Sequence, residues 1–164
     1  MESTIRFTTD STDYHCKQLN LVTLPKNSIS GISTTNNGNT VLSIKDQAIV
    51  SLDTDLTDKD FNLSIGYFSV VSELTSSNNS VTIFLQFGYT HNISGFSFSF
   101  DPISNPGKKL EIIKTGNTVN VKYDNRIIGS SNEITGPLRY IEVHNNDTSF
   151  YPTMEINDVV YTSY

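Results

Sequence analysis

The stretch VNVKYDNRIIGSS, residues 119–131, decides the fold class of this chain. Val119, Val121 and Tyr123 alternate with polar residues, and this period of two is typical of a strand with one buried face. Asp124 and Asn125 follow as a turn, because Asn enters the left-handed backbone region more readily than most residues. The stretch therefore predicts a hairpin of two short antiparallel strands.

The side chains of this hairpin divide between core and solvent. We expect Ile127 of the returning strand to join Val119, Val121 and Tyr123 in the core. The polar and charged residues then occupy the turn and the solvent side, namely Lys122, Asp124, Asn125 and Arg126. We interpret the hairpin as part of the scaffold and not as a ligand site.

The same alternation recurs along most of the chain, separated by clusters of Gly, Pro, Asn and Ser that suit turns. No window of eleven residues shows a helical period. Regular short strands with polar turns predict an antiparallel β-sandwich or barrel with little or no helix. We expect these sets to form the buried faces: Phe61, Leu63 and Ile65; Val81, Ile83, Leu85 and Phe87; Phe96, Phe98 and Phe100; Leu110 and Ile112; Ile141 and Val143; Met154, Ile156, Val159 and Tyr161.

The length of 164 residues suits a single domain over residues 1–164, and a domain of this size buries about 70% of the surface of its unfolded chain. Residues 1–39 are less regular, and they supply either the first strands or an N-terminal arm. Two short strands are expected between residues 41 and 52, after an Asn-Gly turn in residues 34–40.

Composition and charge limit the classes of partner that we expect the chain to bind. The net charge of −6 offers no basic stripe for phosphates, so we expect neither nucleic acid nor an anionic membrane surface as a partner. No run approaches the ~20 apolar residues of a membrane span, and the first residues lack the pattern of a signal peptide. Cys16 is the only cysteine, which excludes an internal disulfide and fits synthesis in a reducing cytosol.

No catalytic or metal motif stands out in the sequence. The acidic run in residues 53–60 departs from a calcium loop, with Thr57, Asp58 and Ser64 where a ligand, a Gly and a bidentate Glu would be needed, so a solvated loop is the better interpretation. The histidines lie in no zinc spacing, and there is no nucleophile elbow. The glutamates are isolated, unlike the paired carboxylates of glycoside hydrolases. We therefore expect no catalytic residue, no metal and no cofactor, and structural calcium is unsupported.

The outward positions of two predicted strands carry a candidate binding site. If Ile141 and Val143 point inward, the residues between them form a row on the other face, because side-chain direction alternates along a strand. Aromatic rings beside amide, carboxylate and imidazole groups suit a carbohydrate, whose apolar face stacks on a ring. The alternative is a row that packs under a loop or against another subunit. The predicted site consists of Phe84, Gln86, Tyr140, Glu142 and His144.

The C-terminal half resembles the concanavalin A-like jelly roll of laminin-G-like and lectin-like modules. The resemblance covers residues 60–164 and lies in GKKLEIIKTGNTVNVKYDNRIIGSS, LRYIEVHNND and MEINDVVYTSY. Val119, Val121, Tyr123, Asp124 and Asn125 match one strand and turn of that superfamily, with Asn125 in place of the usual Gly. The closing strand matches through Ile156, Asn157, Asp158, Val159 and Tyr161, and the Trp that many sugar-binding members use for stacking is absent.

The resemblance implies a jelly-roll β-sandwich and a non-catalytic binding module for surface glycans. A short, Asn- and Ser-rich chain of this look is similar to viral or phage fibre and tail adhesin modules, which implies a virion or extracellular surface location and a homotrimer. The alternative is a structural virion or assembly domain that acts through protein–protein contacts. A glycoside hydrolase is a third, less favoured class, since it needs two carboxylates in one groove.

Overall fold

The computed structural model describes residues 2–5, 21–24, 29–34, 38, 40–44, 49–52, 60–71, 81–89, 92–102, 104–145 and 153–164. Within these ranges the regular structure is entirely β-strand, so none of the described segments is a helix that could cross a membrane. The predicted all-β class is confirmed.

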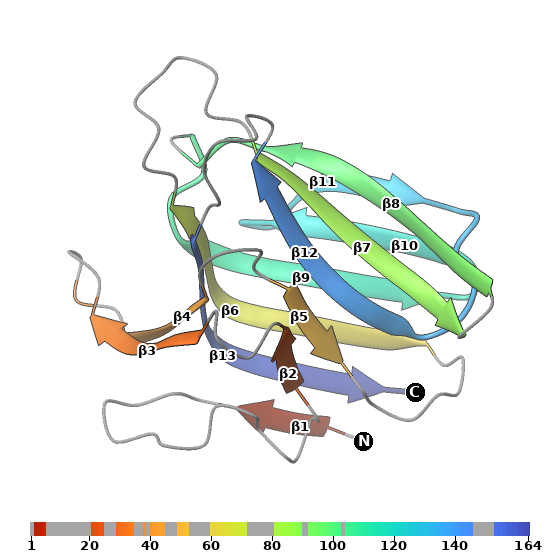
Figure 1. Ribbon diagram of the computed structural model, residues 1–164. Helices are drawn as coiled ribbons and strands as arrows, with labels where there is room; N and C mark the ends of the chain where they lie inside the picture. The colour runs from red at the N-terminus through yellow and green to blue at the C-terminus, as the bar shows by residue number, and fades with distance from the viewer. Residues whose placement is uncertain are drawn as a thin grey trace.

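The strands form two antiparallel sheets that stack as two layers (Figure 1). The larger sheet runs β11-β10-β9-β6-β13-β4-β3, and β1 pairs with β13. Its strands are β1 (Glu2–Ile5), β3 (Ile29–Thr34), β4 (Thr40–Ile44), β6 (Phe61–Val71), β9 (Lys108–Thr115), β10 (Thr118–Tyr123), β11 (Arg126–Ser131) and β13 (Thr153–Ser163). The smaller sheet runs β2-β5-β12-β7-β8, with β2 (Leu21–Leu24), β5 (Ile49–Leu52), β7 (Val81–Tyr89), β8 (Asn92–Phe100) and β12 (Leu138–Asn145).

The core lies between the two sheets and follows the predicted alternation. Along β7, the four residues Val81, Ile83, Leu85 and Phe87 are fully buried, while the residues between them are half-buried. The buried set also contains most of the other predicted faces, namely Phe61, Leu63, Ile65, Phe98, Phe100, Leu110, Ile112, Val119, Val121, Ile141, Met154, Ile156 and Val159. Phe96 and Tyr161 are partly buried and pack against this core, and the side chain of Val143 lies outside the described residues.

Three aromatic rings join the two sheets at one end of this core. Phe68 and Tyr123 belong to the larger sheet, and Phe100 belongs to the smaller one. The Phe100 ring meets Tyr123 edge to face at 5.0 Å between centroids and meets Phe68 at 5.8 Å. Edge-to-face pairs contribute about 0.5–1.5 kcal/mol each beyond the area they bury. The cluster therefore fixes the position of Tyr123 at the end of β10.

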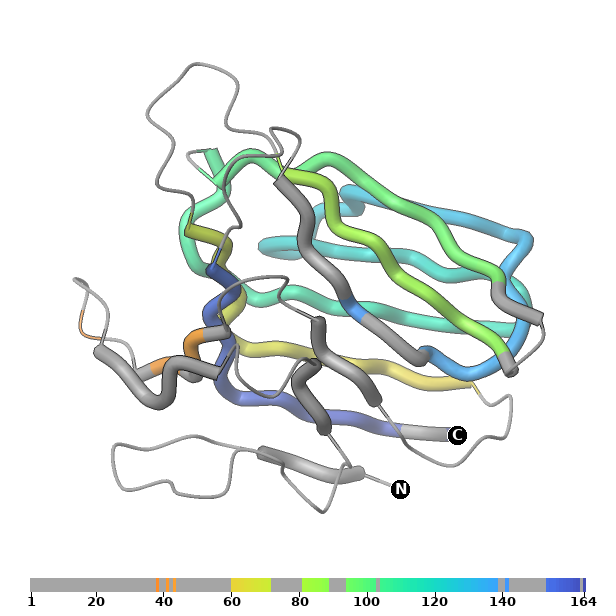
Figure 2. Tube along the Cα trace, in the orientation of Figure 1, coloured from red at the N-terminus to blue at the C-terminus, as the bar shows by residue number. Residues whose placement is uncertain are grey.

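The hairpin predicted over residues 119–131 is formed by β10 and β11, which lie next to β9 at one edge of the larger sheet (Figure 2). Asp124 and Asn125 have φ of 50° and 65°, so the turn between the strands is left-handed at both positions. This geometry matches the twist of a two-residue hairpin. The predicted turn is confirmed.

The prediction for Ile127 is wrong, because this side chain is 62% exposed. A β-bulge is the physical reason: Val121 pairs with Gly129 and Lys122 pairs with Ile127, which leaves Ile128 as the extra residue. The bulge shifts the alternation by one position, so Ile128 is half-buried against the core instead. Period two fails wherever a strand carries such an insertion.

The N-terminal region contributes to both sheets. Within residues 1–39 the structure describes β1, β2 and β3, and β1 pairs with the closing strand from Glu2 opposite Thr162 to Ile5 opposite Val159. Gly38 has φ of 83° within the predicted Asn-Gly turn. The described part of residues 1–39 thus adds strands to the two sheets.

Candidate functional site

The predicted site residues come together in the smaller sheet, where β12 lies beside β7. The backbone register places Tyr140 opposite Gln86, Glu142 opposite Phe84 and His144 opposite Thr82. The two strands therefore bring all five predicted positions into one continuous patch of backbone. The side chains of Tyr140, Glu142 and His144 lie outside the described residues, so their part in a site stays a prediction.

The described members of the patch face away from the core. Phe84 and Gln86 are half-buried, whereas Ile83, Leu85 and Phe87 on the opposite face are fully buried. We call the face of β7, β8 and β12 that carries Phe84 and Gln86 the outer face of the smaller sheet. A partly exposed aromatic ring and an amide thus lie one strand period apart on this face.

The neighbouring strand β8 adds only small side chains to the outer face. Its register places Gly95 opposite Gln86, Ser97 opposite Phe84 and Ser99 opposite Thr82, and all three β8 residues are exposed. Position 95 requires glycine for lack of space, since a Cβ there would lie 2.6 Å from the carbonyl oxygen of Leu85. On the β8 side, the neighbours of Phe84 and Gln86 therefore carry a small side chain or none.

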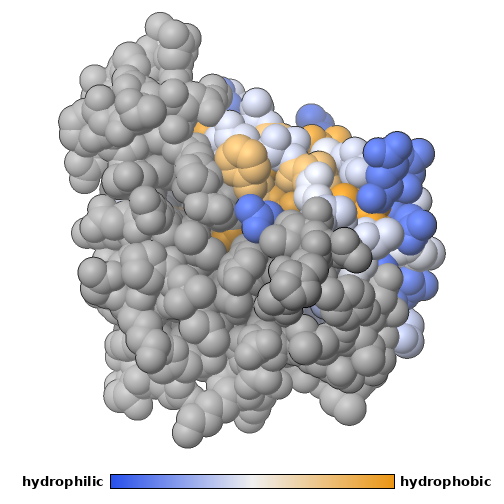
Figure 3. All heavy atoms as spheres, turned by 45° about the vertical axis from the view of Figure 1, so that its right-hand side comes forward, coloured by the Kyte–Doolittle hydropathy of each residue, from blue (hydrophilic) through white to orange (hydrophobic). Residues whose placement is uncertain are grey.

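The described side chains that β7 and β8 place on the outer face are uncharged. Its side chains on β7 and β8 are an aromatic ring, an amide and hydroxyls, from Thr82, Phe84, Gln86, Ser97 and Ser99. None of these groups titrates near neutral pH, and no described residues group three metal-ligating side chains. Figure 3 shows apolar and weakly polar atoms side by side on the described part of the molecular surface, with strongly hydrophilic atoms at its right-hand edge.

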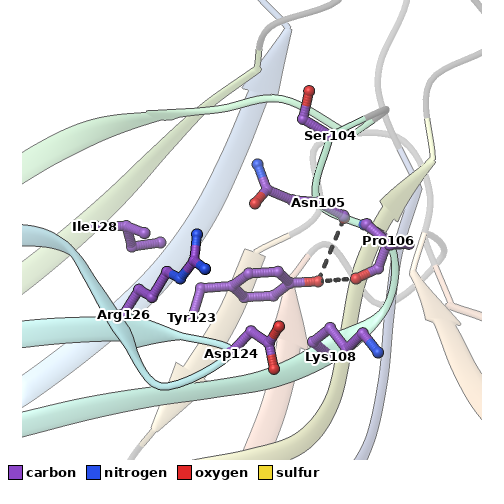
Figure 4. Close-up of a pocket in the computed structure, with 8 residues that line it drawn as sticks. All are labelled: Ser104, Asn105, Pro106, Lys108, Tyr123, Asp124, Arg126 and Ile128. Carbon is purple, nitrogen blue, oxygen red and sulfur yellow. Dashed lines mark hydrogen bonds between the residues drawn. The ribbon is translucent and has the colours of Figure 1, made fainter.

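A pocket of about 340 Å³ lies at the turn end of the β10–β11 hairpin (Figure 4). One wall is the loop before β9, and the other wall is the start of β11. The polar residues that line it are Ser104, Asn105, Lys108, Tyr123, Asp124 and Arg126. The interpretation of the hairpin as scaffold alone missed this pocket, because the loop that forms its second wall is distant in sequence from the turn.

Tyr123 joins the two walls of the pocket. Its hydroxyl donates to the carbonyl oxygen of Pro106 and lies 3.1 Å from the carbonyl oxygen of Phe68 and 3.3 Å from that of Asn105. Burial raises the pKa of this hydroxyl above its ordinary value, so it stays protonated. Three acceptors around one donor require the O–H form, and we assign Tyr123 a structural role.

The acidic run at residues 53–60 ends in a structural carboxylate. Asp60 accepts a hydrogen bond from the backbone N–H of Gly116 at 2.8 Å, and its carbonyl oxygen accepts one from the N–H of Tyr164 at 3.0 Å. Asp60 thereby holds the β9–β10 turn and the C-terminal strand to the start of β6. The other carboxylates of this run lie outside the described residues.

Comparison with known proteins identifies the fold. No protein-family model and no curated protein sequence matches the chain. The botulinum neurotoxin serotype D binding domain is similar with a TM-score of 0.55 and 14% identity, over 98% of this chain and 46% of that chain. The carbohydrate recognition domain of Emp47p is similar with a TM-score of 0.53 and 12% identity, over 98% of this chain and 94% of that chain. Alginate lyase AlgAT5 of polysaccharide lyase family 7 is similar with a TM-score of 0.54 and 10% identity, over 99% of this chain and 94% of that chain.

The chain has the lectin-like jelly-roll fold. It spans less than half the length of the neurotoxin domain and nearly the whole length of the Emp47p domain. Identities of 10–14% extend this likeness to the fold alone. The concanavalin A-like architecture expected from the C-terminal half is therefore confirmed, and it includes the strands of residues 1–39.

Proposed function

We propose that this chain is a non-catalytic module that binds a glycan on the outer face of the smaller sheet. The observation that carries the proposal is the register of β7 and β12, which pairs Phe84 with Glu142 and Gln86 with Tyr140. An aromatic ring can cover the apolar face of a sugar, and an amide can both donate to and accept from its hydroxyls. The Gly and Ser positions of β8 leave room beside these groups.

The structural neighbours support a sugar as the ligand. One of them is a carbohydrate recognition domain with the same fold over nearly the whole chain. Another is an alginate lyase, which keeps a carbohydrate-active enzyme as the competing proposal. We propose binding over catalysis because the glutamates of the sequence are isolated, whereas a glycoside hydrolase needs two carboxylates in one groove. Release of reducing or unsaturated ends from a polysaccharide panel by the purified chain would support the enzyme instead.

Two variants test the binding site. Tyr140→Ala and Gln86→Ala should each abolish binding on a glycan array, because each removes one partner of the same cross-strand pair. We expect the thermal midpoint to stay nearly unchanged, since the register places both positions on the face of the sheet opposite the core. Tyr164→Ala is the matched control, because Tyr164 is 78% exposed at the end of the chain and away from this pair. Normal binding by both site variants would refute the proposed surface.

We further propose that the module acts at the surface of a virus particle or in a cell-surface adhesin, as a trimer when part of a fibre. The Asn- and Ser-rich composition and the absence of a basic stripe support this setting. The alternative is an assembly domain, and the 62% exposed Ile127 on β11, at the end of the larger sheet, supports a protein contact there. Sedimentation of wild type and Ile127→Asp, together with the glycan array, separates the two. Loss of a trimer in the variant with no glycan binding by wild type favours assembly through β11, whereas glycan binding by wild type favours the binding module.

A further inference from the structure

The pocket at the β10–β11 turn offers a second binding site, separate from the outer face of the smaller sheet. Its volume of about 340 Å³ lies at the lower end of the range of roughly 300–1,000 Å³ that is usual for small-molecule sites. A single sugar ring is a ligand of the matching size class. We infer that this pocket binds a small acidic sugar, a uronate whose carboxylate is held by Arg126.

The charge of the pocket is opposite to that of the chain. Lys108 and Arg126 against Asp124 give the lining two positive charges and one negative charge, while the whole chain carries −6. Neither Lys108 nor Arg126 forms an ion pair with another described residue, whereas the adjacent Lys109 pairs with Glu111 at 3.4 Å. Both cations are exposed and therefore accessible to a ligand from solution. A local positive site in an acidic protein draws an anion to this point.

The arrangement of the side chains separates the cation that binds from the acid that would compete with it. In Figure 4 the Arg126 guanidinium lies on the side of the Tyr123 ring that faces Asn105, and the Asp124 carboxylate lies on the other side near Lys108. A guanidinium presents a planar fork that matches a carboxylate through two hydrogen bonds. Arg126 is therefore the group that receives the carboxylate, and Asp124 remains available to accept from a hydroxyl.

The loop opposite Arg126 holds its acceptors in place. Asn105 donates from its side-chain amide nitrogen to the carbonyl oxygen of Asp101 at 3.0 Å, so its amide oxygen turns toward the pocket (Figure 4). Ser104 donates to the Asp101 carboxylate at 2.8 Å. Tyr123 fixes the same loop through Pro106. Acceptors fixed before binding suit the hydroxyls of a sugar and lower the entropy cost of binding.

Ile128 supplies the apolar part of the lining. The β-bulge in β11 turns this half-buried side chain toward the core side, where it lines the pocket together with Arg126. A sugar ring has an apolar face that contacts such a side chain, while inorganic phosphate has none. The mixture of a cation, fixed acceptors and an apolar wall favours an acidic sugar over a free inorganic anion.

The test is to titrate the ¹⁵N-labelled chain separately with glucuronate, glucose and inorganic phosphate. The chemical shifts of the backbone amides, measured by NMR, report binding. We expect glucuronate to shift the amides of Asn105, Lys108 and Asp124 saturably and more tightly than the other two probes. Arg126→Gln should weaken this binding about tenfold to a hundredfold, since a hydrogen bond to a charged group contributes roughly that factor. Lys109→Gln, the matched control outside the pocket, should leave binding within about twofold, since its charge is outside the lining.

Each other result has a defined meaning. No shift at these amides, or equal binding of glucose or phosphate, overturns the assignment of an acidic sugar. Glucuronate binding that is lost in Gln86→Ala but kept in Arg126→Gln places the ligand on the outer face, which overturns this site while supporting the proposed function. Loss in Arg126→Gln with no effect of Gln86→Ala supports a second site, whatever the result on the glycan array.

Discussion

Tyr123 donates its hydroxyl hydrogen bond to the carbonyl oxygen of Pro106, across seventeen positions of sequence. The bond joins the end of β10 to the loop before β9. The ring of Tyr123 also lies in the aromatic cluster with Phe68 and Phe100, which connects the two sheets. One side chain therefore ties the sandwich core to the wall of the pocket.

Tyr123→Phe should lower the stability of the chain. The change leaves the surrounding carbonyl oxygens of Pro106, Phe68 and Asn105 without their donor and keeps the ring packing. We expect a loss of about 1–3 kcal/mol, which corresponds to roughly 2–4 °C in the thermal midpoint per kcal/mol for a chain of this size. Tyr164→Phe, at an exposed position, is the control. A midpoint equal to wild type would show that the hydroxyl is dispensable.

The same substitution should change the response to alkaline pH. The folded state raises the pKa of Tyr123 above the ordinary value of 10.0, mainly through burial. The stability that this group contributes is complete below pH 10.0 and is lost as the pH rises further, because the unfolded tyrosine ionises first. Urea unfolding between pH 8 and 11 should show a steeper loss for wild type than for Tyr123→Phe, within about one pH unit above the ordinary tyrosine pKa. Parallel curves would contradict the linkage.

The fold was largely predictable because its core follows period two. The set Val81, Ile83, Leu85 and Phe87 is apolar at alternate positions and is fully buried. The prediction failed at Ile127 because a β-bulge is a pairing irregularity, and the dipeptide Ile127-Ile128 offers no local signal for which residue is extra. Ile134 is buried in a loop, where the period of two does not apply and therefore does not predict burial.

The candidate site was predictable only in part, for a geometric reason. Alternation alone placed Phe84 and Gln86 opposite the buried face of one strand, which the structure confirms. Their pairing with Glu142 and Tyr140 depends on which strands are neighbours, and β7 and β12 are separated by about fifty residues. The pocket depends likewise on a loop that meets the turn of a different hairpin. Contacts between distant segments leave no periodic signal in one sequence.

The bulge in β11 makes Ile127 and Ile128 respond differently to the same change. Ile127→Lys should cost less than about 0.5 kcal/mol, because its side chain is 62% exposed. Ile128→Lys should cost about 1–3 kcal/mol, since Ile128 packs against the core and an ammonium there loses solvation. Chemical unfolding of the two variants measures both values. The reverse order would mean that the strand pairs without the bulge.

Gly66 and Asp158 should couple in a double-mutant cycle. A Cβ at Gly66 would lie 2.7 Å from the Cβ of Asp158, which has φ of 55° in β13. Gly66→Ala should therefore cost about 1–3 kcal/mol through overpacking. The same change in an Asp158→Gly background should cost at least about 0.5 kcal/mol less, because the opposing Cβ is gone. Equal costs in both backgrounds would assign the effect of Gly66→Ala to its own backbone.

Glu155→Gln should stabilise the chain at neutral pH and lose this advantage in acid. Glu155 lies in β13 between Ser43 of β4 and Ser69 of β6, both buried, and burial raises the pKa of its carboxyl. A raised pKa means that the folded state prefers the neutral acid, so the contribution of Glu155 is complete below the ordinary value of 4.5 and is lost as the pH rises. Gln stays neutral throughout. The urea midpoint of Glu155→Gln should therefore exceed that of wild type at pH 7, and this difference should be smaller at pH 4. A variant that is less stable than wild type at pH 7 would show that a partner on this face stabilises the carboxylate.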